Sequence, residues 1–254
     1  MLQVRHVCAG YEGCEVLHDI SLSVEAGQNL VLMGPNGCGK TTLLRAIAGL
    51  LPAEGEIILM GKSVAKMKRR EIATHMALLS QVSPTYFPYT VFDTVLLGRY
   101  VHQKGAFATP SAEDRAIVRR CLDTVGLLEQ QGKMLDTLSG GQLQRVYLAR
   151  TLAQEPSMIL LDEPTNHLDL KHQIGLMEAL KAWSRTPGHA VVGVLHDVNL
   201  ALSLADRALL MRDGKTIAYG DAQEVITRDR LQEAFEMDVA GYMRGALSRW
   251  EQVK

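Results

Sequence analysis

The sequence predicts an α/β protein with a mainly parallel sheet that helices cover on both faces. Apolar runs of strand length alternate with segments of helical period through much of the chain, and this alternation is typical of parallel sheets. One apolar run leads into a glycine-rich turn and a helix, and another ends in two carboxylates. The stretch from about 82 to 150 shows helical period with few strand-like runs, which predicts a helical insertion.

The first third of the chain contains most of the predicted short strands. Two of them flank turn residues at 10–13, and a later, strongly apolar one runs into the glycine-rich turn. Apolar residues at helical spacing follow, which predicts a helix that starts directly after the turn. The expected strands are 2–7, 20–24, 28–33, 56–60 and 77–81, and the expected helix is 41–49.

Strand-like runs return after residue 157. We expect helices over 91–99 and 112–125, then strands over 158–161, 190–195, 208–211 and 215–219, separated in part by helices over 171–184 and 198–204. No internal repeat or low-complexity linker interrupts the chain. We therefore expect one domain over 1–254, in which 1–81 and 151–254 form the core and about 82–150 form a helical lobe.

Charge and composition narrow the possible partners. The 254 residues are 47% hydrophobic, which is enough for a sizeable core, and 27 basic residues stand against 28 acidic ones for a net charge of -1. A chain without a basic excess is not expected to bind nucleic acid. Five basic residues gather between 62 and 70, and we interpret this cluster as a solvated turn and helix start.

The cysteines and the hydropathy pattern indicate a protein of a reducing compartment without a membrane span of its own. The cysteines at 8, 14, 38 and 121 form no C-x-x-C pair, so neither a disulfide framework nor a zinc site is expected. The first residues lack the apolar core of a signal peptide. No apolar run approaches the roughly 18 residues that span a bilayer, so a role at a membrane requires a partner protein.

The glycine-rich turn has the pattern G-x-x-x-x-G-K-[ST] of a phosphate-binding loop. It reads Gly34-Pro35-Asn36-Gly37-Cys38-Gly39-Lys40-Thr41 and continues into Thr42. Its glycines allow the backbone angles that bring successive N–H groups around phosphates. We expect Lys40 to bind the β- and γ-phosphates and Thr41 to offer its hydroxyl to Mg²⁺. An ordinary glycine-rich turn is the alternative, which the strand before it and the helix after it disfavour.

Two carboxylates follow the apolar run at 158–161. A strand that ends in aspartate beside a phosphate loop commonly supports Mg²⁺, so Asp162 is a candidate metal ligand. Glu163 is then placed to orient or deprotonate the attacking water. The alternative is that both carboxylates are ordinary solvated side chains at a strand end. The presence of a phosphate loop in the same chain disfavours this alternative.

Between these motifs lies Leu138-Ser139-Gly140-Gly141-Gln142. Ser139 and the glycine N–H groups precede a predicted helix and so form a second helix start that can bind an anion, although a flexible turn with a helix cap is the alternative. In this order of motifs, the pentapeptide resembles the signature of the ATP-binding cassette (ABC) family. The resemblance implies a P-loop NTPase fold of the ABC cassette type, with a mainly parallel core sheet, an N-terminal antiparallel β-subdomain and a helical subdomain.

The same resemblance implies the nucleotide and the assembly. In the ABC family the signature contacts the γ-phosphate of ATP that a second subunit holds, so we expect ATP and Mg²⁺ at the seam of a head-to-tail dimer of this chain. Ser139, Gly140, Gly141 and Gln142 would bind the nucleotide of the other copy. Cys38 departs from the family, which more often has serine there, and the backbone contacts of the loop are expected to survive the change.

Four weaker features complete the resemblance. Tyr11 lies where the family places an aromatic ring that stacks on adenine, and Gln81 where it has a glutamine that touches Mg²⁺ or water and couples to the membrane partner. Asp169 ends Asn166-His167-Leu168-Asp169, the loop that crosses the dimer seam. His196 follows a strand where the family has a histidine on the γ-phosphate. Isolated residues of these types are usually structural, so these roles depend on the resemblance.

Stretches at 90–99, 168–173, 196–201 and 224–235 resemble the ATPases of iron-siderophore, haem and cobalamin importers. This branch implies an ATP-hydrolysing importer subunit, peripheral at the cytoplasmic face of the inner membrane. Its partners would be integral-membrane permease subunits and, indirectly, a substrate-binding protein. One cassette without a membrane span differs from fused exporters and from two-cassette translation factors, and no sustained heptads suggest the coiled coils of repair ATPases.

Two alternatives stay open. A soluble ABC ATPase without a permease, either translation-factor-like or regulatory, could carry the same Asn166-His167-Leu168-Asp169 loop. A P-loop small-molecule kinase would use Lys40 and Asp162 but has no use for the signature. Membrane association with a partner argues against the first alternative, and transfer of the γ-phosphate to an acceptor would favour the second.

Overall fold

A computed structural model describes residues 1–80, 88–103, 109–165 and 168–250. The chain divides into two compact units, Met1–Ala65 with Gly193–Lys254, and Lys66–Val192. We call them unit 1 and unit 2 and describe each by itself. The expectation of a single domain over 1–254 stays a prediction. None of the helices in the described ranges provides the apolar stretch of at least 18 residues that a membrane span requires.

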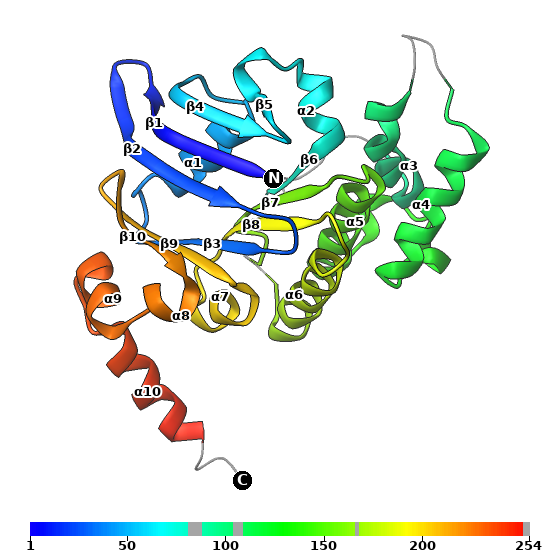
Figure 1. Ribbon diagram of the computed structural model, residues 1–254. Helices are drawn as coiled ribbons and strands as arrows, with labels where there is room; N and C mark the ends of the chain where they lie inside the picture. The colour runs from blue at the N-terminus through cyan, green and yellow to red at the C-terminus, as the bar shows by residue number, and fades with distance from the viewer. Residues whose placement is uncertain (81–87, 104–108, 166–167, 251–254) are drawn as a thin grey trace. The chain divides into compact units, whose positions relative to one another are not determined.

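Unit 1 begins with a four-stranded antiparallel sheet in the order β2-β1-β4-β5. Its strands are β1 (Leu2–Tyr11), β2 (Cys14–Val24), β4 (Ala53–Leu59) and β5 (Lys62–Ser63). The first two form the long hairpin drawn in blue in Figure 1. This sheet corresponds to the antiparallel β-subdomain that the sequence resemblance implies.

Both hairpin strands are longer than the predicted 2–7 and 20–24. The pairing of β1 with β2 shifts register between Val4 and Val7, and again before Gly10. His6 and Asp19 have positive φ angles of 49° and 57°. Such irregularities interrupt the alternation of buried and exposed residues on which strand prediction depends, so the pattern ends before the strand does.

The second part of unit 1 carries the phosphate loop. Strand β3 (Asn29–Met33) is fully buried and pairs in parallel with β9 (Arg207–Arg212), while β10 (Lys215–Asp221) pairs with β9 antiparallel. Helix α1 (Lys40–Ile47) follows β3. The remaining helices are α7 (Val198–Leu204), α8 (Ala222–Val225), α9 (Arg228–Phe235) and α10 (Val239–Trp250). Strand β8 (Ala190–Val194) crosses the boundary between the units.

Unit 2 combines parallel strands with a group of helices. Strand β6 (Met76–Ser80) pairs in parallel with β7 (Met158–Asp162), from Met76 opposite Met158 to Ser80 opposite Asp162. Its helices are α2 (Arg69–His75), α3 (Val91–Leu96), α4 (Ala112–Thr124), α5 (Gly140–Ala153) and α6 (Leu170–Ser184), with short 3₁₀ turns at η2 (Leu97–His102), η3 (Leu128–Gln130) and η4 (Leu135–Thr137). The short 3₁₀ turn η1 (Val64–Lys66) crosses the boundary between the units. Helices α3 and α4 pack against α5, as the green segments of Figure 1 show.

The predicted helix over 91–99 is an α-helix only as far as Leu96 and continues as the 3₁₀ turn η2. Gly98 lies against α5 so closely that a Cβ there would be 2.3 Å from the carbonyl oxygen of Arg150. A close approach of this kind requires glycine. The α-helix thus changes to a 3₁₀ turn where its backbone contacts α5. The periodicity of the sequence gives no sign of such a contact.

A buried ion-pair network fixes η2 within the helical group. The Arg99 side chain is only 6% exposed; its Nε donates to Oδ1 of Asp114 at 2.8 Å, and its Nη1 donates to the Ala153 carbonyl at 2.8 Å and to Glu155 Oε2 at 2.7 Å. Asp114 also forms a capping box with Ser111 at the start of α4. The hydrogen bond from Arg99 lowers the pKa of Asp114 to about 2.

We expect Arg99→Met to lower the free energy of unfolding by about 3 kcal/mol, because it leaves a buried carboxylate without its cation. Thermal unfolding at neutral pH measures the loss, and Arg115→Met on the exposed face of α4 is the control. Since the folded-state pKa of Asp114 is depressed, its contribution is present above its unfolded pKa and is lost as pH falls toward about 2. Equal stability of Arg99→Met and Arg115→Met would contradict the assignment.

Candidate functional site

The phosphate loop leaves the carboxyl end of β3 and enters α1, which is the strand–loop–helix context that the motif requires. Gly34 has a φ of 149°, and a Cβ there would lie 2.1 Å from the Met211 carbonyl oxygen. Gly39 has a φ of 102°, and its Cβ would lie 2.7 Å from Cδ2 of Leu17. These glycines are therefore required both by backbone angle and by close approach to β9 and β2.

Lys40 is the first residue of α1 and is only 5% exposed. Its Nζ donates to the carbonyl oxygens of Gly34 and Pro35, each at 2.8 Å. The ammonium group thus lies inside the curve of the loop, where phosphate oxygens can replace the two carbonyls as acceptors. Asn36 and Gly37 are exposed at the tip of the loop, and Thr41 and Thr42 follow on α1.

The start of α1 suits an anion. No side chain caps the helix at Gly39, and no acidic residue lies in the first turn, so the positive end of the helix dipole meets no opposing carboxylate in that turn. Cys38 is buried beside Lys40, and burial raises the pKa of its thiol. The thiol therefore stays neutral at physiological pH and adds no negative charge to the phosphate site.

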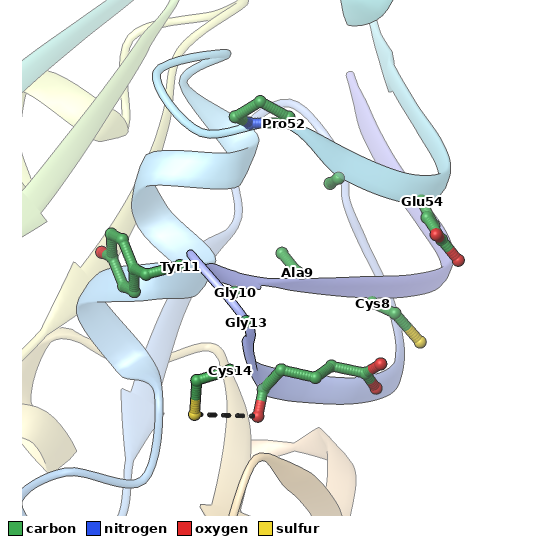
Figure 2. A pocket seen from close by; sticks show the side chains of 10 residues that line it. Cys8, Ala9, Gly10, Tyr11, Gly13, Cys14, Pro52 and Glu54 are labelled. Carbon is green, nitrogen blue, oxygen red and sulfur yellow. Dashed lines mark hydrogen bonds between the residues drawn. The ribbon is translucent and has the colours of Figure 1, made fainter.

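Tyr11 lies at the end of β1 and is 45% exposed. Its hydroxyl accepts a hydrogen bond of 3.0 Å from Nη1 of Arg45, which lies five residues after Lys40 on α1, about 7.5 Å along the helix axis. Figure 2 shows the ring at one edge of a pocket of about 450 Å³ that the hairpin end shares with Pro52 and Glu54. Helix α1 thus links the aromatic ring to the phosphate loop.

The two carboxylates lie at the end of β7 in unit 2, where Met158–Leu161 are buried and Asp162 and Glu163 are half-buried. Glu163 adopts a left-handed backbone with a φ of 54°. Such strain at a residue other than glycine is found preferentially at functional sites. The next residue is fixed by Gln144, whose buried Nε2 donates to the Pro164 carbonyl at 2.9 Å. The sequence pattern does not indicate this role for Gln144, because the contact is tertiary.

Ser139 caps helix α5. Its Oγ accepts from the Gln142 N–H at 3.3 Å, and Oε1 of Gln142 accepts from the Ser139 N–H at 2.9 Å. Gln142 Nε2 also donates to Gln130. Ser139 and Gly140 are exposed, so the capped turn offers its hydroxyl side and first glycine to the outside of unit 2.

Asp169 caps helix α6 by accepting from the N–H of His172 at 2.9 Å. That hydrogen bond, with smaller contributions from the His172 ring and Lys171, lowers the pKa of Asp169. Asp169 is therefore anionic at neutral pH. Asn166, His167 and Gln81, the glutamine expected to touch Mg²⁺ or water, lie outside the described residues.

His196 is exposed directly after β8. The following Asp197 caps α7 by accepting from the N–H groups of Asn199 and Leu200. Unit 1 thus carries the phosphate loop, Tyr11 and His196, while unit 2 carries Asp162, Glu163, the signature and Asp169. The functional roles of these residues stay predictions. The structure describes the local geometry around each of them.

The sequence of this chain is similar to those of known proteins. The sequence model described as "ABC transporter" matches residues 17–166. The uncharacterized ABC transporter ATP-binding protein YvrA of Bacillus subtilis (strain 168) is 38% identical over 239 residues, which cover 94% of this chain and 54% of that protein. The chain therefore spans about half the length of this relative.

Two further similarities cover nearly the whole of both chains. The hemin import ATP-binding protein HmuV of Bradyrhizobium diazoefficiens is 39% identical over 247 residues, covering 94% of this chain and 89% of that one. A solved structure described as a metal-chelate type ABC transporter in an inward-facing conformation matches with a TM-score of 0.82 at 28% identity, over 93% of this chain and 89% of that one. The predicted fold class is thereby confirmed.

Proposed function

Because this chain belongs to the ABC transporter family, we propose that it is the ATP-hydrolysing subunit of an importer, which energises uptake of a metal chelate through a separate membrane permease. The observation that carries this proposal is the presence of a structured phosphate loop and a capped signature turn in one chain. The stretches that resemble iron-siderophore, haem and cobalamin importers support the cargo class, as does the similarity to a hemin import protein.

ATP binds first at the phosphate loop in this proposal. Residues 34–42 surround the phosphates, with Lys40 turning from the carbonyls of Gly34 and Pro35 to the β- and γ-phosphates. Tyr11 stacks on adenine, and its hydrogen bond to Arg45 keeps the ring beside α1. A small-molecule kinase would share these contacts, so the loop alone does not decide between the two activities.

Hydrolysis requires a water molecule and a proton acceptor. The half-buried Glu163 is the proposed general base, and its left-handed backbone sets the direction of its side chain. His196 contacts the γ-phosphate, and Gln81 senses the nucleotide and the permease. Thr41 and Asp162 offer a hydroxyl and a carboxylate, which are oxygen donors of the kind Mg²⁺ accepts beside phosphates. The ion would neutralise charge on the phosphates.

The second half of each ATP site comes from another copy of the chain. Ser139, Gly140, Gly141 and Gln142 contact the nucleotide held by the partner copy, and Asp169 lies at the seam. The exposure of Ser139 and Gly140 supports this arrangement, as does the anion-binding character of a helix start. The single domain over 1–254 then acts as one half of a head-to-tail dimer.

The permease surface is proposed on unit 2. Leu97 and Tyr100 of η2 are 47% and 75% exposed, and Tyr89 before α3 is also exposed. The buried Arg99, which lies between them in the sequence, anchors η2 to α4 and α5. The exposed side chains of Leu97 and Tyr100 therefore belong to a turn that is held in place. Leu97 and Tyr100 are three residues apart in a 3₁₀ turn, so their side chains lie on the same face, which is the proposed contact with the permease. The subunit is then peripheral, at the cytoplasmic face of the inner membrane, and meets the substrate-binding protein only through the permease.

Uptake by the reconstituted complex tests the proposal. Proteoliposomes that contain the chain, its permease and the binding protein are expected to take up a ferric chelate, haem or cobalamin only with Mg-ATP. Tyr100→Ala should weaken copurification with the permease, while exposed Arg115→Ala on α4 should not. ATP turnover without membrane association would instead favour a soluble ABC ATPase. Phosphate transfer to a small-molecule acceptor would favour a kinase.

A further inference from the structure

His172 lies where the signature turn meets the helix that follows the Asp169 loop. Gly141 in the first turn of α5 packs directly on the imidazole ring, since a Cβ on this glycine would lie 2.8 to 2.9 Å from three ring atoms. A non-bonded contact of a Cβ below 3.0 Å forces one of the two groups to move. The ring and the glycine therefore fit together only as long as residue 141 has no side chain.

The same ring is tied to Asp169. Nδ1 of His172 lies 2.6 Å from Oδ1 of Asp169, and the backbone N–H of His172 donates to that oxygen at 2.9 Å. Because an ionised carboxylate only accepts hydrogen bonds, the Nδ1 of His172 carries the proton. One side chain thus contacts a glycine of the signature and the carboxylate that caps α6.

The ring also borders a pocket. A cavity of about 310 Å³ is lined by His172 together with residues of α4, α5 and α6, among them Thr124, Arg145, Lys171 and Gly175. On that side the imidazole borders open space rather than a close-packed core. The ring thus contacts Gly141 and Asp169 and also borders this cavity.

We propose that His172 is a positioning residue that sets the signature turn and Asp169 at a fixed distance and orientation, so that both meet the nucleotide and the seam of a second copy together. The inference rests on the proposed function, because it assumes that the signature acts on ATP held by another copy. It assigns His172 no contact with ATP. Its effect is on assembly of the dimer rather than on binding of nucleotide to the phosphate loop, which belongs to unit 1.

Dimer formation in the full-length Glu163→Gln chain gives the first test. Light scattering measures the Mg-ATP concentration at half-maximal dimerisation, and fluorescence of mant-ATP measures nucleotide binding by the dilute chain. His172→Ala is expected to raise the dimerisation midpoint about tenfold and to leave mant-ATP affinity unchanged. His172→Asn, which keeps a donor for Asp169, should restore part of the loss. Glu178→Ala, at an exposed position further along α6, is the control.

The outcomes separate the two proposals. If Glu163→Gln itself does not dimerise, the composite site is wrong and the role of His172 falls with it. If Glu163→Gln dimerises and His172→Ala has the same midpoint, only the role of His172 is overturned. A fall in mant-ATP affinity and thermal stability equal to the loss of dimerisation would show a general folding defect and would also overturn it.

A double-mutant cycle tests the Gly141 contact directly. Gly141→Ala places a methyl group against the ring and should raise the dimerisation midpoint about tenfold or more. The His172→Ala background lacks the three ring atoms that lie nearest to this methyl group, so the effect of the same substitution should be smaller there. Equal effects of Gly141→Ala in both backgrounds would show that the glycine acts without His172, and would contradict the proposal.

Discussion

Glu163→Gln is expected to reduce the kcat for ATP hydrolysis by a factor of about 10² to 10⁴ while the chain still binds ATP. The amide has the shape of the carboxylate but does not accept a proton from the attacking water, and general-base catalysis contributes about this factor. Phosphate release measures turnover, and mant-ATP fluorescence measures binding. Glu178→Gln, on the exposed face of α6, is the matched control and should keep full activity.

Glutamine can replace Glu163 without a change in backbone conformation. Its φ of 54° lies in the left-handed region, and glutamine retains the same Cβ and backbone cost. Pro164 remains held by Gln144. The free energy of unfolding should therefore change little, so a loss of turnover reports on the chemistry rather than on the fold. Full turnover by Glu163→Gln would remove Glu163 from the role of general base.

Lys40→Ala is expected to weaken ATP binding by about 100-fold or more, since it removes the only loop side chain that places a full positive charge on the phosphates. Isothermal titration with Mg-ATP measures the change, and exposed Lys215→Ala on β10 is the control. ATP affinity equal to that of the parent chain would exclude Lys40 from phosphate binding.

The removal of Lys40 also takes away two hydrogen bonds within the loop, from Nζ to the Gly34 and Pro35 carbonyls. Lys40→Arg tests whether this internal role explains the result. It keeps a charged donor but presents a broader group to the narrow loop. Thermal stability close to that of the parent, together with lost affinity, places the effect of Lys40→Ala on the nucleotide.

The elements that sequence predicts best are buried strands bounded by strong signals. Strand β3 is fully buried and ends at the glycines of the phosphate loop, and β7 ends at two carboxylates. Helix α4 begins with a capping box at Ser111 and keeps helical period through Thr124. Local propensity, burial pattern and end signals agree at these places, which is the condition for a reliable prediction.

Other elements could not be predicted because their cause is tertiary. Helix α10 contains Gly241 and Gly245, two poor helix formers, so local propensity does not favour a helix there. The bulges of β1 and β2 depend on pairing across the sheet. Sequence spacing predicts which residues form the phosphate loop and the signature, but not that His172 packs on Gly141 or that Gln144 holds the loop after Glu163.

The size of the Glu163→Gln chain with and without Mg-ATP tests the central claim, which is that each ATP is held between two copies. We expect a monomer without nucleotide and a dimer with Mg-ATP by light scattering. Ser139→Arg in the same background should prevent the dimer, because a long cationic side chain replaces the exposed cap of α5. A chain that stays monomeric at saturating Mg-ATP, or a dimer that Ser139→Arg leaves intact, would contradict the account.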